Sequence, residues 1–266
     1  MIKIKNAGTH KKNNNQINFD FAFENSVRSR IATTVGLKTQ QYIAICARPG
    51  VGKSWLAQNL IVDILSEMDE NALYVSFEMS MEQLDKRFKL SYSDLYEDEI
   101  ANHLNVIDEM ITPEELEYAI KKTKPRVVVI DHINLVKGIK QYSSKLKQLA
   151  IKYNVLMLVC CQVNRIMDVN KEFTMSMIRD CGRIEQDADQ VWYIPTNKDG
   201  IFVAKNREGI SNIWISIGWD DEDLIFRNFD YNGIDIDYYK NRSDMFEQEE
   251  KEEETYDWNI YPVIKI

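Results

Sequence analysis

Cysteines and long apolar runs are scarce in this sequence, and a signal-like N-terminus is missing. Its four cysteines among 266 residues form no CxxC pair and show no spacing typical of a metal site, so we expect reduced, mostly buried thiols. No apolar run approaches the ~18 residues that a membrane span requires. The first residues contain lysines but no apolar core, unlike a secretory signal peptide. These absences favour a cytoplasmic protein with no membrane partner.

The chain also lacks the excess of positive charge that is typical of nucleic-acid-binding proteins. Its net charge is −9, but this charge is unevenly placed. Residues 219–266 contain 5 Lys/Arg and 15 Asp/Glu, whereas residues 1–218 contain 28 basic and 27 acidic side chains. A nearly neutral body gives no compositional support for DNA binding. Any contact with DNA must therefore come from specific residues.

Apolar strands alternate with helical patterns from Tyr42 onward. The segments YIAICA, ALYVSF, RVVVID and VLMLVCCQ are almost continuously apolar, and helical patterns separate them. Such strands are typical of a parallel sheet covered on both faces. After Gln190, the segments QVWYIP, IFVAKN, NIWISIGW and LIFRNF follow one another without helices, which predicts an antiparallel extension. We predict an α/β fold with a mostly parallel central sheet, flanking helices and an antiparallel C-terminal extension.

Local signals divide the chain further. Ser80 with Gln83, and Thr112 with Glu115, have the spacing of helix-capping boxes. Residues 1–40 are expected to be an N-terminal arm, polar and mobile over its first part. Residues 41–230 are expected to form the α/β domain, and residues 231–266 an acidic tail. A four-residue apolar repeat within the arm predicts a short amphipathic helix, with Phe23, Val27, Ile31 and Val35 on one face.

A phosphate-binding loop follows the first strand of the domain. The segment ARPGVGKS fits G-x-x-x-x-G-K-[ST], except that Ala47 occupies the first glycine position. Backbone N–H groups of such a loop converge on an anion at a helix N-terminus. Lys53 would reach the outer phosphates of a nucleotide, and the Ser54 hydroxyl would take part in a magnesium site. The predicted nucleotide-binding residues are Arg48, Pro49, Gly50, Val51, Gly52, Lys53, Ser54 and Trp55.

Polar residues end three of the predicted strands or follow them directly. Asp131 would support the metal, although an aspartate at a strand end is also common as a turn or cap residue. Glu78 would polarise a water for attack on the γ-phosphate, or else serve as an acid at a helix N-terminus. Gln162 would sense the γ-phosphate, or else be an ordinary strand-end residue. We interpret His132 as a packing or loop residue rather than a ligand.

Taken together, these segments resemble the C-terminal ATPase domain of DnaB-type replicative helicases, which has a RecA-like fold. The resemblance runs in order through about residues 42–230. ARPGVGKS resembles the family's phosphate loop, VSFEMSMEQL its catalytic-glutamate segment, VVVIDHINLV its magnesium strand and CCQVNR its sensor motif. IRDCGRIEQDADQVWYI is similar to its most distinctive stretch, and VAKNREG to its arginine-finger hairpin.

The resemblance implies specific roles. It implies a ring, expected to be a hexamer, that moves on single-stranded DNA. The ring would hydrolyse ATP with Mg²⁺ at its subunit interfaces. Lys205 and Arg207 would act in trans on the nucleotide of a neighbouring subunit; the alternative is an exposed hairpin with ordinary surface charges. The implied catalytic residues are Lys53, Glu78, Gln162, Lys205 and Arg207, and the implied metal-site residues are Ser54 and Asp131.

The resemblance also indicates where DNA would bind. The matching positions are Arg179, Asp180 and Gly182, where arginine supplies charge and glycine lets backbone N–H groups approach a phosphate. Alternatively, Gly182 ends a helix as its C-terminal cap. A helicase loader, a primase or another replication protein is a further candidate partner.

The sequence departs from the family in ways that keep alternatives open. Only about 40 residues precede the phosphate loop, so we expect the family's helical collar domain to be absent, as in a phage, plasmid or other mobile-element protein. The segment 23–35 would then be a remnant of the family's linker helix that docks on a neighbouring subunit. A RecA-like DNA-binding recombinase or helicase-accessory protein without processive unwinding is the main alternative. A non-catalytic regulator is less well supported, because every expected catalytic position is filled. The acidic run EQEEKEEE is either a solvated end or a peptide that competes with DNA or recruits a partner.

Overall fold

The computed structural model describes the α/β domain in nine stretches of chain. These are residues 5–6, 31, 34–65, 70–96, 100–163, 182–196, 198, 200–220 and 225–227. The predicted acidic tail lies outside the described residues, as do Arg179 and Asp180.

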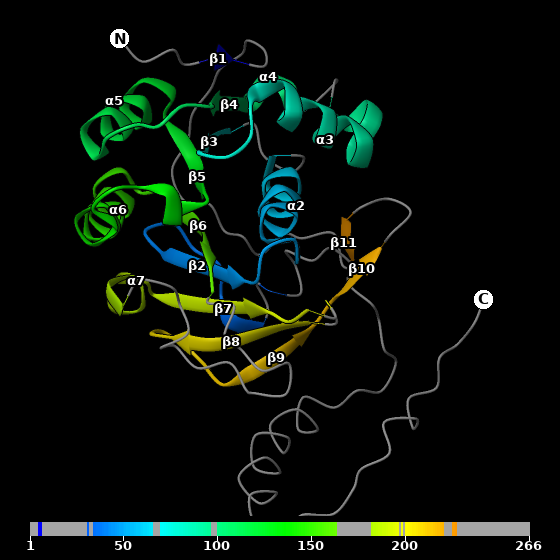
Figure 1. Ribbon diagram of the computed structural model, residues 1–266, viewed down its shortest axis with the longest axis vertical. Helices are drawn as coiled ribbons and strands as arrows, with labels where there is room; N and C mark the ends of the chain where they lie inside the picture. The colour runs from blue at the N-terminus through cyan, green and yellow to red at the C-terminus, as the bar shows by residue number, and fades with distance from the viewer. Residues whose placement is uncertain are drawn as a thin grey trace, which may run out of the picture. The chain divides into compact units, whose positions relative to one another are not determined.

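A nine-stranded sheet lies at the centre of the domain, with strand order β1-β4-β3-β5-β6-β2-β7-β8-β9 (Figure 1). The six strands from β4 to β7 in this order are parallel, whereas β1, β8 and β9 pair antiparallel to their neighbours. The strands are β1 (Lys5–Asn6), β2 (Tyr42–Ala47), β3 (Asn71–Ser76), β4 (Leu104–Ile107), β5 (Pro125–Asp131), β6 (Leu156–Gln162), β7 (Gln190–Ile194), β8 (Gly200–Asn206) and β9 (Ile213–Ser216).

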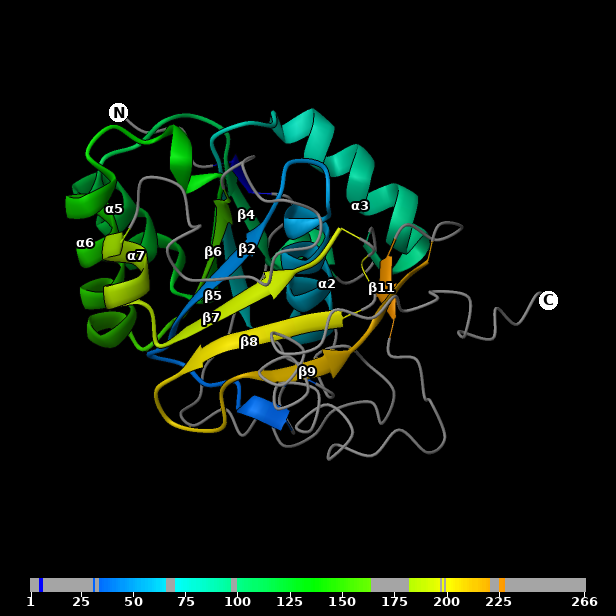
Figure 2. The same cartoon turned by 60° about the horizontal axis from the view of Figure 1, so that its bottom comes forward.

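Helices cover both faces of this sheet (Figure 2). One face packs against α2 (Lys53–Leu65) and α3 (Met81–Leu95), and the other against α5 (Pro113–Thr123), α6 (Ile139–Tyr153) and α7 (Gly182–Asp187). Side chains of β2 alternate between the two cores: Ile43 and Ile45 face the first, and Tyr42 and Ala44 the second. This two-sided burial explains the nearly continuous apolar strands of the sequence. Two short elements complete the set, α4 (Ala101–His103) and the 3₁₀ turn η2 (Ile133–Leu135).

Both predicted capping boxes are present. Thr112 Oγ1 accepts from the backbone N–H of Glu115, and the Glu115 side chain accepts from the N–H of Thr112, at 3.2 and 2.8 Å. Ser80 and Gln83 make the same reciprocal pair at the start of α3. These bonds satisfy N–H groups that the first helical turn leaves free, which is why the helix starts were readable from the sequence.

The C-terminal strands differ in part from the prediction. β8 and β9 form the antiparallel extension, but β7 pairs parallel to β2. The predicted strand NIWISIGW is broken, and its second half forms β10 (Gly218–Asp220), which pairs with β11 (Ile225–Arg227) in a separate two-stranded sheet. The Asn59 side chain of α2 bonds to both the backbone N–H and the carbonyl of Phe226, at 3.0 and 3.3 Å. The hairpin therefore packs on α2 instead of lengthening the main sheet.

Two strands at the other edge were not predicted. β4 contains only the four residues LNVI, and β1 consists of two polar residues of the predicted mobile arm. Backbone pairing between them needs no apolar pattern. Ile31, Val35 and Leu37 are buried in the first core, so the described part of the predicted amphipathic segment packs within its own subunit.

The cysteines and the helix lengths can be compared with what the sequence predicted. Cys46, Cys160 and Cys161 are buried free thiols, as predicted for these three. Over the described residues, no helix has both the length and the apolar character that a membrane crossing would need.

Candidate active site

The polar residues predicted at strand ends meet at one edge of the sheet. β3, β5, β6 and β2 are consecutive neighbours and run parallel. Ser76 at the end of β3 is in register with Asp131 of β5, and Gln162 of β6 with Ala47 of β2. The phosphate loop follows Ala47, so it starts beside Gln162. The carboxyl edge of such a sheet is where ligands of open α/β folds bind.

The phosphate loop turns sharply into α2. Gly50 and Gly52 have φ values of 76° and 120°, a region that residues with a Cβ rarely occupy. Lys53 begins α2 and is 8% exposed, and its Nζ lies 3.4 Å from the carbonyl oxygen of Arg48. The lysine therefore lies along its own loop, at the N-terminus of a 13-residue helix that favours an anion.

Ser54 and Asp131, the two predicted metal-site residues, contact each other directly. Ser54 Oγ donates to Asp131 Oδ1 at 2.9 Å, and Tyr74 OH donates to Asp131 Oδ2 at 2.7 Å. Burial, followed by the charge of Asp131, raises the pKa of Tyr74 well above its usual value. Tyr74 was not predicted from the sequence, although a tyrosine in an apolar strand signals a hydroxyl that needs a partner. Hydroxyl and carboxylate oxygens are the ligands that Mg²⁺ prefers, so these residues fit the ion.

Glu78 and Gln162 meet through His132. His132 Nδ1 lies 2.7 Å from Glu78 Oε2, and His132 Nε2 lies 3.1 Å from Gln162 Oε1. His132 does occupy a loop position after β5, with a left-handed backbone of φ 71°. Its ring, however, contacts two predicted catalytic side chains, a role that the interpretation as a packing or loop residue missed. Asn134 Oδ1 accepts from the backbone N–H of Gln162 at 2.6 Å and holds the end of β6.

Lys205 and Arg207 lie at the opposite edge of the sheet. β8 runs antiparallel to β7, and Asn206 at the end of β8 is in register with Gln190 at the start of β7. Gln190 is in turn in register with Ile43, near the start of β2. The phosphate loop begins after the last residue of β2, roughly 13 Å of strand further along. The structure therefore does not bring this pair to the phosphate loop of the same chain.

Within their own subunit, both cations contact the C-terminal part of α7. Lys205 Nζ donates to the carbonyl oxygens of Glu185 and Ala188, at 2.5 and 2.8 Å. Arg207 donates to the carbonyl of Gln186 and lies 3.6 Å from Asp189 Oδ1. Burial, followed by the charge of Arg207, lowers the pKa of Lys205. Positive groups are stabilised at a helix C-terminus, while Arg207 stays 46% exposed at its side chain.

Comparison with known proteins decides the family. The model described as "DnaB-like helicase C terminal domain" matches residues 30–111 and 97–228, which together exceed half of the 266 residues. The chain belongs to this DnaB-like family. The resemblance predicted from the sequence is thereby confirmed.

Curated relatives of this DnaB-like domain are replicative helicases by name. "Probable plasmid replicative DNA helicase" of Chlamydia trachomatis serovar L2 is 25% identical over 236 residues, covering 73% of this chain and 52% of the relative. "Replicative DNA helicase DnaB" of Geobacillus stearothermophilus is 27% identical over 232 residues, covering 66% of this chain and 50% of the relative. The chain thus spans about half the length of these relatives.

Solved structures show the same fold. One, titled as an ATPase domain, superposes with a TM-score of 0.64 at 21% identity, over 73% of this chain and 87% of that one. A second, "The Structure Of A DnaB-Like Replicative Helicase And Its Interactions With Primase", superposes with a TM-score of 0.62 at 21% identity, over 72% of this chain and 58% of that one. The predicted RecA-like fold is therefore confirmed.

The stretch GRIEQDADQ of this DnaB-like domain joins several elements. Asp189 Oδ2 accepts from the backbone N–H of Tyr42 at 2.7 Å and from Lys147 Nζ at 2.6 Å. Gln190 Nε2 donates to the carbonyl of Gly36 at 2.8 Å. The backbone carbonyl of Asp189 accepts from the N–H of Arg207 at 2.9 Å. The stretch therefore holds the start of β2 and the Arg207 hairpin together.

An aromatic hairpin covers the phosphate loop, which the sequence did not predict. Trp219 of β10 packs edge-on against Trp55 with ring centroids 5.7 Å apart, and the Arg87 guanidinium lies 4.9 Å from the Trp55 ring centre. A Cβ placed on Gly52 would lie 3.1 Å from Phe226 Cζ of β11. The signal was the concentration of aromatic residues in NIWISIGW and LIFRNF, whose partner could not be read locally.

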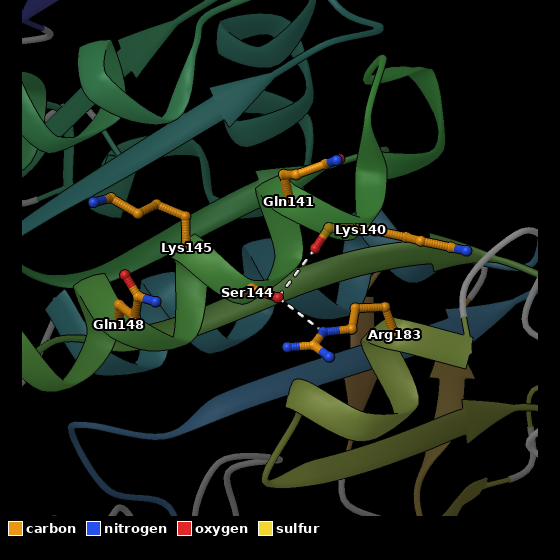
Figure 3. A pocket seen from close by; sticks show the side chains of 6 residues that line it. All are labelled: Lys140, Gln141, Ser144, Lys145, Gln148 and Arg183. Carbon is orange, nitrogen blue, oxygen red and sulfur yellow. Dashed lines mark hydrogen bonds between the residues drawn. The ribbon is translucent and has the colours of Figure 1, made fainter.

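Of the predicted DNA-binding residues, the structure describes Gly182. It is the first residue of α7, so the alternative that it caps a helix end is wrong. The next residue lies in a pocket of about 440 Å³ between α6 and α7 (Figure 3). There Arg183 Nε donates to Ser144 Oγ at 2.8 Å and also pairs with Asp187. The pocket is lined by Lys140, Gln141, Ser144, Lys145, Gln148 and Arg183.

Proposed function

We propose that this chain is the ATP-hydrolysing motor domain of a replicative DNA helicase. It would assemble as a ring, in our proposal a hexamer, and move on single-stranded DNA while it hydrolyses ATP between subunits. The observation that carries this proposal is the placement of Arg207 at the sheet edge opposite the phosphate loop. Because a protomer's own Arg207 lies away from its own loop, we assign Arg207 to the nucleotide of a neighbouring subunit.

The nucleotide would bind at the carboxyl edge of the sheet. The N–H groups at the start of α2 would hold the phosphates, and Lys53 would turn from the Arg48 carbonyl to the outer phosphates. Ser54 and Asp131 would hold Mg²⁺, which when bound neutralises charge on the β- and γ-phosphates. Tyr74 would keep the Asp131 carboxylate in place through its 2.7 Å bond.

Hydrolysis requires a base and a group that detects the γ-phosphate. In our proposal Glu78 accepts a proton from water as the water oxygen attacks the γ-phosphorus, and ADP leaves with the bridging oxygen. Gln162 contacts the γ-phosphate from the neighbouring strand. An arginine from an adjacent subunit accelerates such reactions by roughly 10³–10⁵, and we assign this role to Arg207, with Lys205 beside it.

The proposed partners follow from the family. Arg179, Asp180 and Gly182 would contact the phosphate backbone of single-stranded DNA. A primase or a helicase loader would be a further partner, since one similar structure is titled for a helicase and its interactions with primase. DNA replication in bacteria takes place in the cytoplasm, which is where we place the protein.

A strand-separation assay tests this function. We expect the wild-type chain to hydrolyse ATP faster when single-stranded DNA is present and to separate a forked duplex. Lys53→Ala and Arg207→Ala should abolish both activities, whereas Lys121→Ala, an exposed change on α5, should retain both.

Two results would contradict the proposal in different ways. DNA-stimulated hydrolysis without strand separation would favour a RecA-like recombinase or helicase-accessory protein. A wild-type chain that hydrolyses no ATP in the presence of Mg²⁺ and DNA would exclude the motor itself.

A further inference from the structure

The Glu78 side chain is exposed, yet its segment is firmly held. The side chain has 59% of its surface accessible. Its backbone segment is fixed, because Phe77 N donates to the Asp131 carbonyl at 3.2 Å and Met79 N donates to Ser76 Oγ at 2.8 Å. A glutamate on a fixed backbone still has several rotamers. The carboxylate therefore needs a side-chain partner if it is to stay in one position.

His132 supplies that partner. A carboxylate only accepts hydrogen bonds, so His132 Nδ1–H donates to Glu78 Oε2 across their 2.7 Å separation. This bond uses one carboxylate oxygen and leaves Oε1 for a water. The His132 backbone is held, because its carbonyl accepts from Leu135 N at 3.1 Å. The imidazole is mostly enclosed, with only 17% of the His132 side chain exposed.

The other side of the ring lies against Gln162. His132 Nε2 is 3.1 Å from the amide oxygen Oε1 of Gln162, and the backbone N–H of Gln162 is held by Asn134. An amide can present either its oxygen or its NH₂ group by rotating. A change in what the Gln162 amide faces therefore acts directly on the ring that holds Glu78.

We propose that His132 is a positioning residue that couples Gln162 to the general base Glu78. The inference rests on the proposed ATP hydrolysis and deepens it, since it assigns a route between two side chains whose separate roles came from the family resemblance. Contact of Gln162 with the γ-phosphate orients its amide, the amide orients the His132 ring, and the ring holds Glu78 with Oε1 toward the attacking water. The base is thus in place when a γ-phosphate is present to be cleaved.

The backbone of His132 allows a clean set of variants. Its φ of 71° suits glycine and is tolerated by asparagine. H132G therefore removes the ring without straining the turn. H132N places an amide N–H near the former Nδ1, so it can still donate to Glu78, but it is too short to reach Gln162.

Steady-state kinetics of ATP hydrolysis test the proposal. H132G should lower kcat about 10- to 100-fold, as expected for a misplaced base. KM and the equilibrium binding of a fluorescent ATP analogue should stay within about 2-fold, because no group that holds the nucleotide is lost. H132N should recover most of the lost kcat. The melting temperatures of both variants serve as the control for folding.

A double-mutant cycle tests the coupling itself. If His132 and Gln162 act in one chain of contacts, H132G should lower kcat by a much smaller factor in a Q162A background than in the wild type. Additive losses would overturn the coupling, and a folded H132N as slow as H132G would overturn the positioning of Glu78. Wild-type kcat in H132G, alongside inactive Lys53→Ala and Glu78→Gln, would refute this inference while leaving the proposed function intact.

Discussion

At the scale of single residues, the phosphate loop depends on two glycines for different reasons. Both have a left-handed backbone, which strains any residue with a Cβ. A Cβ on Gly50 would meet no atom within 4 Å, whereas one on Gly52 would lie 3.1 Å from the Phe226 ring. Gly50 is therefore needed for the turn alone, and Gly52 for the turn and for the closeness of the β10–β11 hairpin.

This difference predicts unequal effects of alanine. Gly50→Ala should cost about 1 kcal/mol of stability through backbone strain, and Gly52→Ala about 2–4 kcal/mol because overpacking adds to the strain. Gly52→Ala should also weaken nucleotide binding more, since Phe226 has to move over the loop. Thermal unfolding and titration with a fluorescent nucleotide would measure both effects. Equal losses for the two variants would show that the Phe226 contact has no energetic weight.

At the scale of elements, α5 and α6 are joined by one carboxylate. Glu117 of α5 accepts from Lys152 Nζ and from Tyr153 OH of α6, both at 2.7 Å. Hydrogen bonding from Lys152, and then from Tyr153, lowers the pKa of Glu117 to about 2. The Lys152 pKa rises through the same bond. Two helices on one face of the sheet are thus held together in a way that depends on pH.

The sign of that dependence follows from the lowered pKa. A carboxylate whose folded pKa lies below its usual 4.5 stabilises the fold above that value and loses the contribution as pH falls toward about 2. Glu117→Gln should therefore lower the melting temperature at pH 7, and the difference from wild type should shrink between pH 5 and about 2.

Melting curves across this pH range would check the sign. Glu208→Gln is the matched control, because Glu208 forms an exposed ion pair with Lys38 and such pairs contribute little. A gap between Glu117→Gln and wild type that stays constant down to pH 2 would contradict the assignment.

At the scale of the whole molecule, the residues that we propose to act on ATP lie at two edges of one sheet. The phosphate loop follows the end of β2, whereas Arg207 follows β8 near the start of β7. Parallel strands place all their carboxyl ends on one side, and the antiparallel strand β8 returns the chain to the other. In our proposal, one subunit would therefore present a nucleotide site on one edge and the arginine finger Arg207 on the other, a head-to-tail arrangement that suits a closed ring.

Mixing two inactive variants tests this division. Glu78→Gln keeps the proposed arginine finger and lacks the proposed base, whereas Arg207→Ala keeps the proposed base and lacks the proposed finger. In a random 1:1 mixture, about one quarter of the interfaces pair an intact site with an intact finger, so a corresponding part of the ATPase activity should return. Adding Lys53→Ala to the Arg207→Ala partner should abolish the recovery. A mixture as inactive as its components would argue that Arg207 does not act in trans.

The sequence alone determined the local structural features of this protein. The phosphate loop, the capping boxes of α3 and α5, the buried strands and the acids at their ends each depend on neighbouring residues, through backbone hydrogen bonds and side-chain periodicity. The same order of motifs was sufficient to predict the family and the α/β class, both of which are confirmed.

Tertiary structure decided which of these parts meet. The bond from Tyr74 to Asp131, the His132 ring between Glu78 and Gln162, and the β10–β11 hairpin over the loop all join residues that lie tens of positions or more apart. Tertiary structure also decided that Arg207 lies far from the phosphate loop of its own chain. Strand order and strand direction place these residues, and both are set by pairing across the whole sheet, which no local stretch of sequence specifies.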